Sequence, residues 1–203
     1  MDPGVLPAPG YVEIGAIAIT PRRAVLVQAF SLLLALATLV VLLWAGGITS
    51  VTIGPAQLVQ ILGVFAGASC VIFLHEAVHG LVFALSGLPP RFSAGIVHGM
   101  PVLATTTDRP YRRNTALICL LAPLVLIDVA LLGLSVVQPT LYTWIIAPVV
   151  INTAGAAGDL WQAAHLAGYG PAVLVADVPD GLVVHGISDE KSPGGRPPHP
   201  TRK

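Results

Sequence analysis

Residues 24–75 contain no Asp, Glu, Lys or Arg, and this uncharged run constrains the fold more than any other feature of the chain. Over all 203 residues, 55% are hydrophobic and only 10% are charged, whereas a soluble domain carries about 25% charged residues. The sequence therefore indicates a chain that lies in lipid. Its formal net charge is zero and it has no basic patch, which excludes a nucleic-acid-binding protein.

Four segments are apolar and long enough to span a bilayer, which requires roughly 20 residues. They cover residues 24–45, 56–87, 114–137 and 141–167, and Asp128 interrupts the third. We therefore predict an all-α membrane protein that forms a bundle of four transmembrane helices, with short β-hairpins on the cytoplasmic side.

The predicted hairpins lie outside the spans. Residues 91–97 and 101–107 are rich in small and β-branched residues and flank a turn-like stretch that contains His98. Residues 172–178 and 182–187 flank Pro179-Asp180-Gly181, a strong turn signal. Both patterns are typical of two strands joined by a tight connection.

Arginines predict the orientation of the spans. Arg22 and Arg23 precede the first span, and further arginines lie between the second and third, whereas the opposite loops carry no charge. The positive-inside rule then places both termini in the cytoplasm, and the composition suggests a bacterial cell membrane. The predicted organisation is a cytoplasmic N-terminal segment (1–21), a membrane domain (22–169), a cytoplasmic β-hairpin (170–187) and a disordered tail (188–203).

The second span contains the pattern H-E-x-x-H, at His75, Glu76 and His79. Two histidines four residues apart lie about one helical turn from each other, so both can bind a single Zn²⁺. The glutamate lies near enough to activate water without being a ligand. Ionisable groups at membrane depth are costly, so their presence here indicates a function.

A catalytic zinc site requires a third protein ligand. Asp159 is preferred, because it should reach a depth in the fourth span similar to that of the two histidines. Asp128 would lie deeper; it is an alternative ligand or a proton relay, or it bonds a polar group of a neighbouring helix. Asn152 precedes Asp159 by two helical turns, and it could orient the aspartate or hold a substrate carbonyl.

These residues resemble a known family. The histidine-glutamate motif in a membrane helix, a loop with a hairpin, and then Asn152 and Gly158-Asp159 are similar to site-2-protease-like intramembrane zinc metalloproteases. The chain looks closest to the small membrane proteins of the family called "Putative zincin peptidase". That resemblance implies His75, His79 and Asp159 as ligands and Glu76 as the base, although site-2 proteases read L-D-G where this chain reads Gly158-Asp159-Leu160.

The sequence thus predicts a zinc-dependent metalloendopeptidase that cleaves membrane-associated protein or peptide substrates. Glu76 would take a proton from water, and zinc with Asn152 would stabilise the tetrahedral oxyanion. One alternative is a catalytically inactive zinc-binding membrane protein, either a pseudoprotease or an assembly factor. Another is a transporter or channel component, which the lack of an inverted repeat disfavours.

Overall fold

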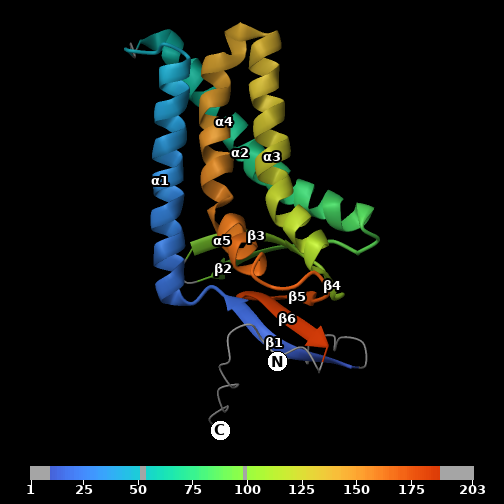
Figure 1. Ribbon diagram of the computed structural model, residues 1–203. Coiled ribbons are helices and arrows are strands. Elements are labelled where there is room, and N and C mark those ends of the chain that lie inside the picture. Colours follow the sequence, from blue (N-terminus) through green and yellow to red (C-terminus); the bar gives the residue numbers. More distant parts are fainter. Residues whose placement is uncertain (1–9, 51–53, 98–99, 188–203) are drawn as a thin grey trace.

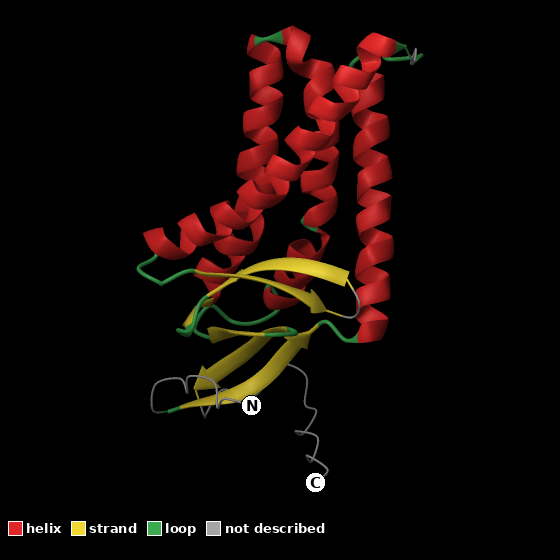
Figure 2. Ribbon diagram, turned by 180° about the vertical axis from the view of Figure 1, so that it is seen from behind, coloured by secondary structure: helices red, strands yellow, loops and turns green. Residues whose placement is uncertain are grey.

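The computed structural model describes residues 10–50, 54–97 and 100–187. A group of long helices stands above two small antiparallel sheets, as Figures 1 and 2 show from opposite sides. The predicted tail at 188–203, His98 and most of the N-terminal segment before β1 lie outside the described residues.

The helices lie close to the predicted spans. They are α1 (Pro21–Ala45), α2 (Pro55–Leu85), α3 (Arg113–Val137), α4 (Tyr142–Gly155) and α5 (Ala157–Leu166). Four helical segments, with η1, α4 and α5 taken together, are long and apolar enough to cross a membrane. Large apolar side chains are exposed along them, among them Leu32, Trp44 and Val136, with 70%, 83% and 80% of their surface accessible. Such a surface suits lipid better than water.

The fourth predicted span is not a single helix. It begins with a short 3-10 turn, η1 (Pro139–Leu141), and continues as α4 to Gly155. Ala156 then separates α4 from α5, which begins at Ala157. Small residues at Gly155 and Ala156 occupy this break. The break matters because Asp159 then lies in the first turn of a new helix.

Helix α2 has 31 residues, which at 1.5 Å per residue gives a length of about 46 Å. A bilayer core is only about 30 Å thick, so a helix of this length would either cross it at a tilt or extend beyond it. Figure 1 shows α2 running diagonally behind α3 and α4. Helix α4 contacts α1, α2 and α3. A side chain at Gly63 of α2 would collide with the Trp144 ring of α4, so glycine permits this close packing.

Two β-hairpins lie below the helices, as predicted. The first pairs β2 (Arg91–Val97) with β3 (Met100–Thr106). The second pairs β5 (Leu174–Val178) with β6 (Gly181–Ile187). An ion pair between Arg91 and Asp108 lies at the open end of the first hairpin.

The second hairpin is the centre of a larger sheet than the sequence predicted. Strand β1 (Tyr11–Ala18) pairs with β6, and the short β4 (Tyr111–Arg112) pairs with β5, which gives the order β1-β6-β5-β4. The predicted N-terminal segment therefore contains a strand. Val175 and Val184 of this sheet are fully buried and share a core with Ala116 and Leu166 at the helix ends. The sheet is thus packed against the ends of α3 and α5.

Candidate metal centre

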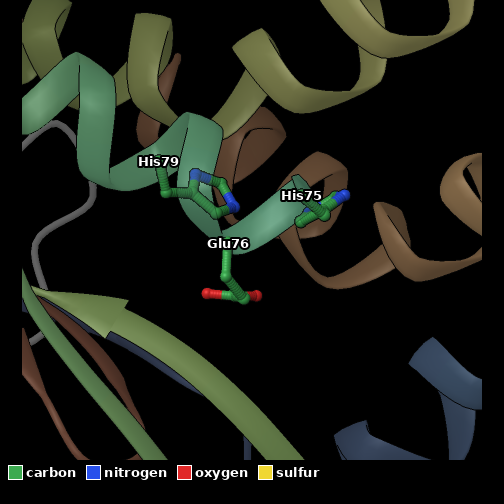
Figure 3. A group of neighbouring side chains, drawn as sticks. All are labelled: His75, Glu76 and His79. Atoms are coloured by element: carbon green, nitrogen blue, oxygen red, sulfur yellow. The ribbon is translucent and has the colours of Figure 1, made fainter. Parts of the chain in front are cut away.

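Helix α2 presents His75 and His79 to the interior of the protein, where both are buried. Their ring centroids are 5.0 Å apart, as expected for residues one helical turn apart. Figure 3 shows Glu76 between them, with its carboxylate extending from α2 towards the strands. Donor atoms of His75, Glu76 and His79 all lie within 4.8 Å of one another. These three residues can therefore surround a metal ion.

Asp159 comes to the same place from α5. Its Oδ2 lies 3.0 Å from Nε2 of His75 and 3.5 Å from Nε2 of His79. The carboxylate belongs to the first turn of α5, where the unpaired backbone N–H groups favour negative charge. One oxygen thus faces the same nitrogen atom of both imidazoles, which is the convergence that a shared metal requires.

The second nitrogen of each imidazole faces an oxygen. Nδ1 of His79 lies 2.9 Å from the backbone carbonyl oxygen of Cys119, and Nδ1 of His75 lies 3.0 Å from Oδ1 of Asn152. A carbonyl oxygen can only accept, so each Nδ1 acts as the donor. When a metal takes the proton's place between Nε2 and Asp159, each Nε2 is left to bind it through its lone pair, as a metal-binding histidine must.

Asn152 is bonded to three protein groups, and its predicted role at the oxyanion stays a prediction. Its amide nitrogen donates to the carbonyl of Pro123 at 3.2 Å and to Oδ1 of Asp128 at 2.9 Å. Both amide protons are therefore engaged, while Oδ1 accepts from His75. The side chain is fully enclosed. These contacts suit a residue that orients a histidine, with both amide protons bonded to acceptors of α3.

Asp128 lies behind Asn152. Its Oδ1 accepts from Asn152, and its Oδ2 accepts from the hydroxyl of Thr153 at 2.9 Å. Of the roles considered for Asp128, these contacts favour a polar bond between helices over a metal ligand, because both oxygens already have donors.

Glu76 is held from the hairpin. The hydroxyl of Thr105, on β3, lies 2.9 Å from Oε2 of Glu76 and 3.0 Å from the Glu76 backbone oxygen. Thr105 was not predicted from the sequence, because a threonine in a short strand carries no signal of such a contact. The hairpin thus fixes the direction of the carboxylate.

A cavity of about 1440 Å³ lies between α2, the β2–β3 hairpin and strands of the larger sheet. His75, Glu76, His79 and Asp159 all line it. It exceeds the roughly 300–1,000 Å³ that small-molecule sites occupy, so it can accommodate a segment of polypeptide. Six carboxylate residues line the cavity: Glu13, Glu76, Asp108, Asp159, Asp177 and Asp180.

Asp177 ties the larger sheet to the segment that follows the hairpin. Its carboxylate accepts from the Tyr111 hydroxyl at 2.5 Å and from the Thr107 backbone N–H at 2.8 Å. Burial raises the pKa of the Asp177 carboxyl, and burial together with the nearby aspartate raises the pKa of Tyr111.

The donors suit zinc, and two sets of three are available. Two imidazole nitrogens and one carboxylate oxygen are common ligands of catalytic zinc. The carboxylate could come from Asp159 or from Glu76, which is within reach of both histidines. Asp159 fits better as the ligand, because a single oxygen faces both Nε2 atoms, whereas Glu76 is bonded by Thr105. His165 bonds the Trp161 backbone and takes no part.

The comparison with family models agrees with this donor set. Residues 68–174 match the model of the family described as "Putative zincin peptidase". The matched range includes the histidine motif, the β2–β3 hairpin, all of α3 and Asp159. No curated protein and no solved structure matches the chain. Because the match covers more than half of its length, the chain belongs to this zincin peptidase family.

Proposed function

We propose that this protein is a membrane-embedded zinc metalloendopeptidase that hydrolyses peptide bonds of membrane-associated proteins or peptides. One observation carries the proposal: Nε2 of His75 and Nε2 of His79 both face Oδ2 of Asp159, while each Nδ1 is tied to a carbonyl oxygen. Two histidines with fixed tautomers and a shared carboxylate are what a catalytic zinc site needs.

The residues divide into ligands and a base. His75, His79 and Asp159 hold the metal. When bound, zinc supplies Lewis acidity, which lowers the pKa of water towards 7 and stabilises negative charge on a carbonyl oxygen. Glu76 accepts the proton of the attacking water and then donates it to the leaving amine. Thr105 keeps the Glu76 carboxylate directed at this position through its 2.9 Å hydrogen bond.

The substrate enters the cavity in an extended form, because a helix hides its peptide bonds inside its own hydrogen bonds. The β2–β3 hairpin has only two strands, so backbone groups at its edges can pair with an added strand. Residues of both strands line the cavity beside Glu76. The hairpin would thus position the segment that is cleaved.

The four helical segments cross the membrane in this proposal, and both sheets lie on one side of it. Arginines lie in the first turn of α1 and at the start of α3, and these ends of the two helices lie beside the sheets. The positive-inside rule assigns this end to the cytoplasm, together with both termini, in a bacterial cell membrane. The metal centre lies near the same end, because His75 and His79 belong to the C-terminal half of α2.

Proteolysis is tested by comparing cells that express the wild type with cells that express Glu76→Gln. Glutamine keeps the shape of the side chain and loses the base. Membrane fractions are labelled at newly formed N-termini and identified by mass spectrometry. We expect a set of termini in wild-type cells that is absent with Glu76→Gln at equal expression. Identical sets of termini would leave a zinc-binding protein without peptidase activity.

A further inference from the structure

Helix α3 contributes none of the proposed ligands, yet it contacts the groups that hold both histidines. Cys119, Pro123 and Asp128 all belong to it. The first offers its backbone carbonyl to His79, and the other two receive the amide protons of Asn152. A proline and an aspartate are both unfavourable inside a membrane helix, so their presence on α3 requires an explanation.

Pro123 explains why the Cys119 carbonyl is available. In an α-helix the carbonyl of residue i normally accepts from the N–H of residue i+4. Residue i+4 from Cys119 is Pro123, which has no N–H. The Cys119 oxygen therefore lacks the usual donor in its own helix, and Nδ1 of His79 lies 2.9 Å from it. Pro123 itself is fully buried.

Asp128 acts on the other histidine through Asn152. An amide can turn over and present either nitrogen or oxygen to Nδ1 of His75. With Asp128 and the Pro123 carbonyl on one side, both of them acceptors, the nitrogen must face them. The amide oxygen then faces His75 at 3.0 Å. Thr153 holds Asp128 by donating to its second oxygen.

We propose that α3 is an orienting scaffold for the metal centre, in which Pro123 and Asp128 are positioning residues. Pro123 frees a carbonyl that fixes the tautomer of His79, and Asp128 fixes the amide that sets the tautomer of His75. Both imidazoles then carry the proton on Nδ1 and direct the Nε2 lone pair to the metal. The inference rests on the proposed zinc site, and it assigns Asp128 neither a ligand nor a proton-carrying role.

Zinc affinity tests the scaffold without any need for a substrate. The purified protein in detergent competes for zinc with a chelator of known affinity, and thermal unfolding is recorded for the same samples. Loss of an outer partner of a zinc ligand typically weakens affinity about 10–100-fold. Pro123→Ala returns an N–H to the Cys119 carbonyl, and we expect affinity to fall by about 10-fold. Unfolding should not become easier, because alanine favours helix.

Pro148→Ala is the matched control, since Pro148 is also a buried proline inside a helix, α4. Among the described residues, no hydrogen bond joins Pro148 to either histidine. Zinc affinity should therefore stay within about threefold of the wild type, well short of the loss that follows when an outer partner of a zinc ligand is removed. Equal losses in Pro123→Ala and Pro148→Ala would overturn the assigned role of Pro123, because any proline would then have the same effect.

Asp128 is tested with two variants. Asp128→Leu removes the acceptor, and affinity should fall about 10–100-fold. Asp128→Asn keeps an oxygen for Asn152 and has no negative charge, so it should bind zinc nearly as well as the wild type. An equal loss in both variants would show that the charge itself is needed, which contradicts a positioning role. If every variant binds zinc like the wild type, the scaffold is wrong while the zinc site stands. A folded wild type that binds no zinc would overturn both.

Discussion

Asp159 and Glu76 compete for the role of third ligand, and two matched substitutions separate them. Asp159→Asn and Glu76→Gln each replace a carboxylate by the amide of the same shape, within one centre. The Asp159 oxygen lies 3.0 and 3.5 Å from the two Nε2 atoms, whereas the Glu76 oxygen is bonded by Thr105 at 2.9 Å. Only Asp159→Asn should therefore weaken zinc binding.

The size of the effect follows from the number of ligands. Structural zinc sites have four protein ligands and bind with roughly 10–16 kcal/mol, so one ligand that contributes an equal share is worth roughly 2.5–4 kcal/mol. At about 1.4 kcal/mol per factor of ten, affinity should fall on the order of 100-fold in Asp159→Asn. Glu76→Gln should stay within about threefold, as expected for a residue that is not a ligand.

Chelator competition at constant pH and ionic strength measures both variants beside the wild type. A large loss in Glu76→Gln together with wild-type affinity in Asp159→Asn would refute the assignment. The ligand set would then be His75, Glu76 and His79, and the protein would lack its base. Unfolding curves of both variants exclude a loss that arises from misfolding.

Three further predictions concern the surroundings of the site. Thr105→Val removes the hydrogen bond to Glu76, so peptidase activity should fall about 10-fold, within the range for bonds to charged groups, while zinc content, measured on the same sample, stays the same. Burial raises the pKa of Asp177 above its ordinary 3.8, so the folded protein loses stability as pH rises from that value through the raised pKa. Asp177→Asn should remove this decline, which is measured by unfolding curves recorded from about pH 4 to neutrality. A difference in the free energy of unfolding between wild type and variant that does not change with pH would contradict the prediction. Chelation of zinc should lower the unfolding temperature, and added zinc should restore it, because free zinc at 100 times its dissociation constant raises the free energy of unfolding by about 2.7 kcal/mol. An unfolding temperature that zinc does not change would speak against binding to the folded state.

The membrane segments could be predicted because apolar length is a property of the sequence itself. The spans at 24–45 and 114–137 fall within three residues of α1 and α3. The break at Ala156 was missed, since a stretch of small residues is compatible with a continuous helix. Its consequence, a carboxylate in the first turn of α5, becomes visible only in the fold.

The sheet was predicted only in part, because pairing between distant segments leaves little trace in either strand. The β5–β6 hairpin has a turn signal at its centre and was found. Strand β1 has no such neighbour: it pairs with β6, from the other end of the chain, and its register shifts between Glu13 and Gly15. Alternating burial is weak in this strand, so no clear period-2 pattern identifies it.

The same division holds at the metal centre. His75, Glu76 and His79 follow from spacing within one helix, and that part could be read directly. Asn152 and Asp128 were also named from the sequence, but their partners could not be predicted, because Asn152 reaches His75 from α4 and Asp128 reaches Asn152 from α3. One signal was present in the sequence. A proline inside a membrane helix frees the carbonyl four residues before it, and Pro123 thereby pointed to Cys119.

The central claim is that His75, His79 and Asp159 form a zinc site in a folded membrane protein. The most direct test is the zinc content per chain of detergent-purified protein, measured by mass spectrometry beside His79→Ala, with unfolding curves for both. We expect about one zinc per wild-type chain, as for a single catalytic site, and almost none in His79→Ala. A wild type that is folded, has been exposed to zinc and carries none would contradict it.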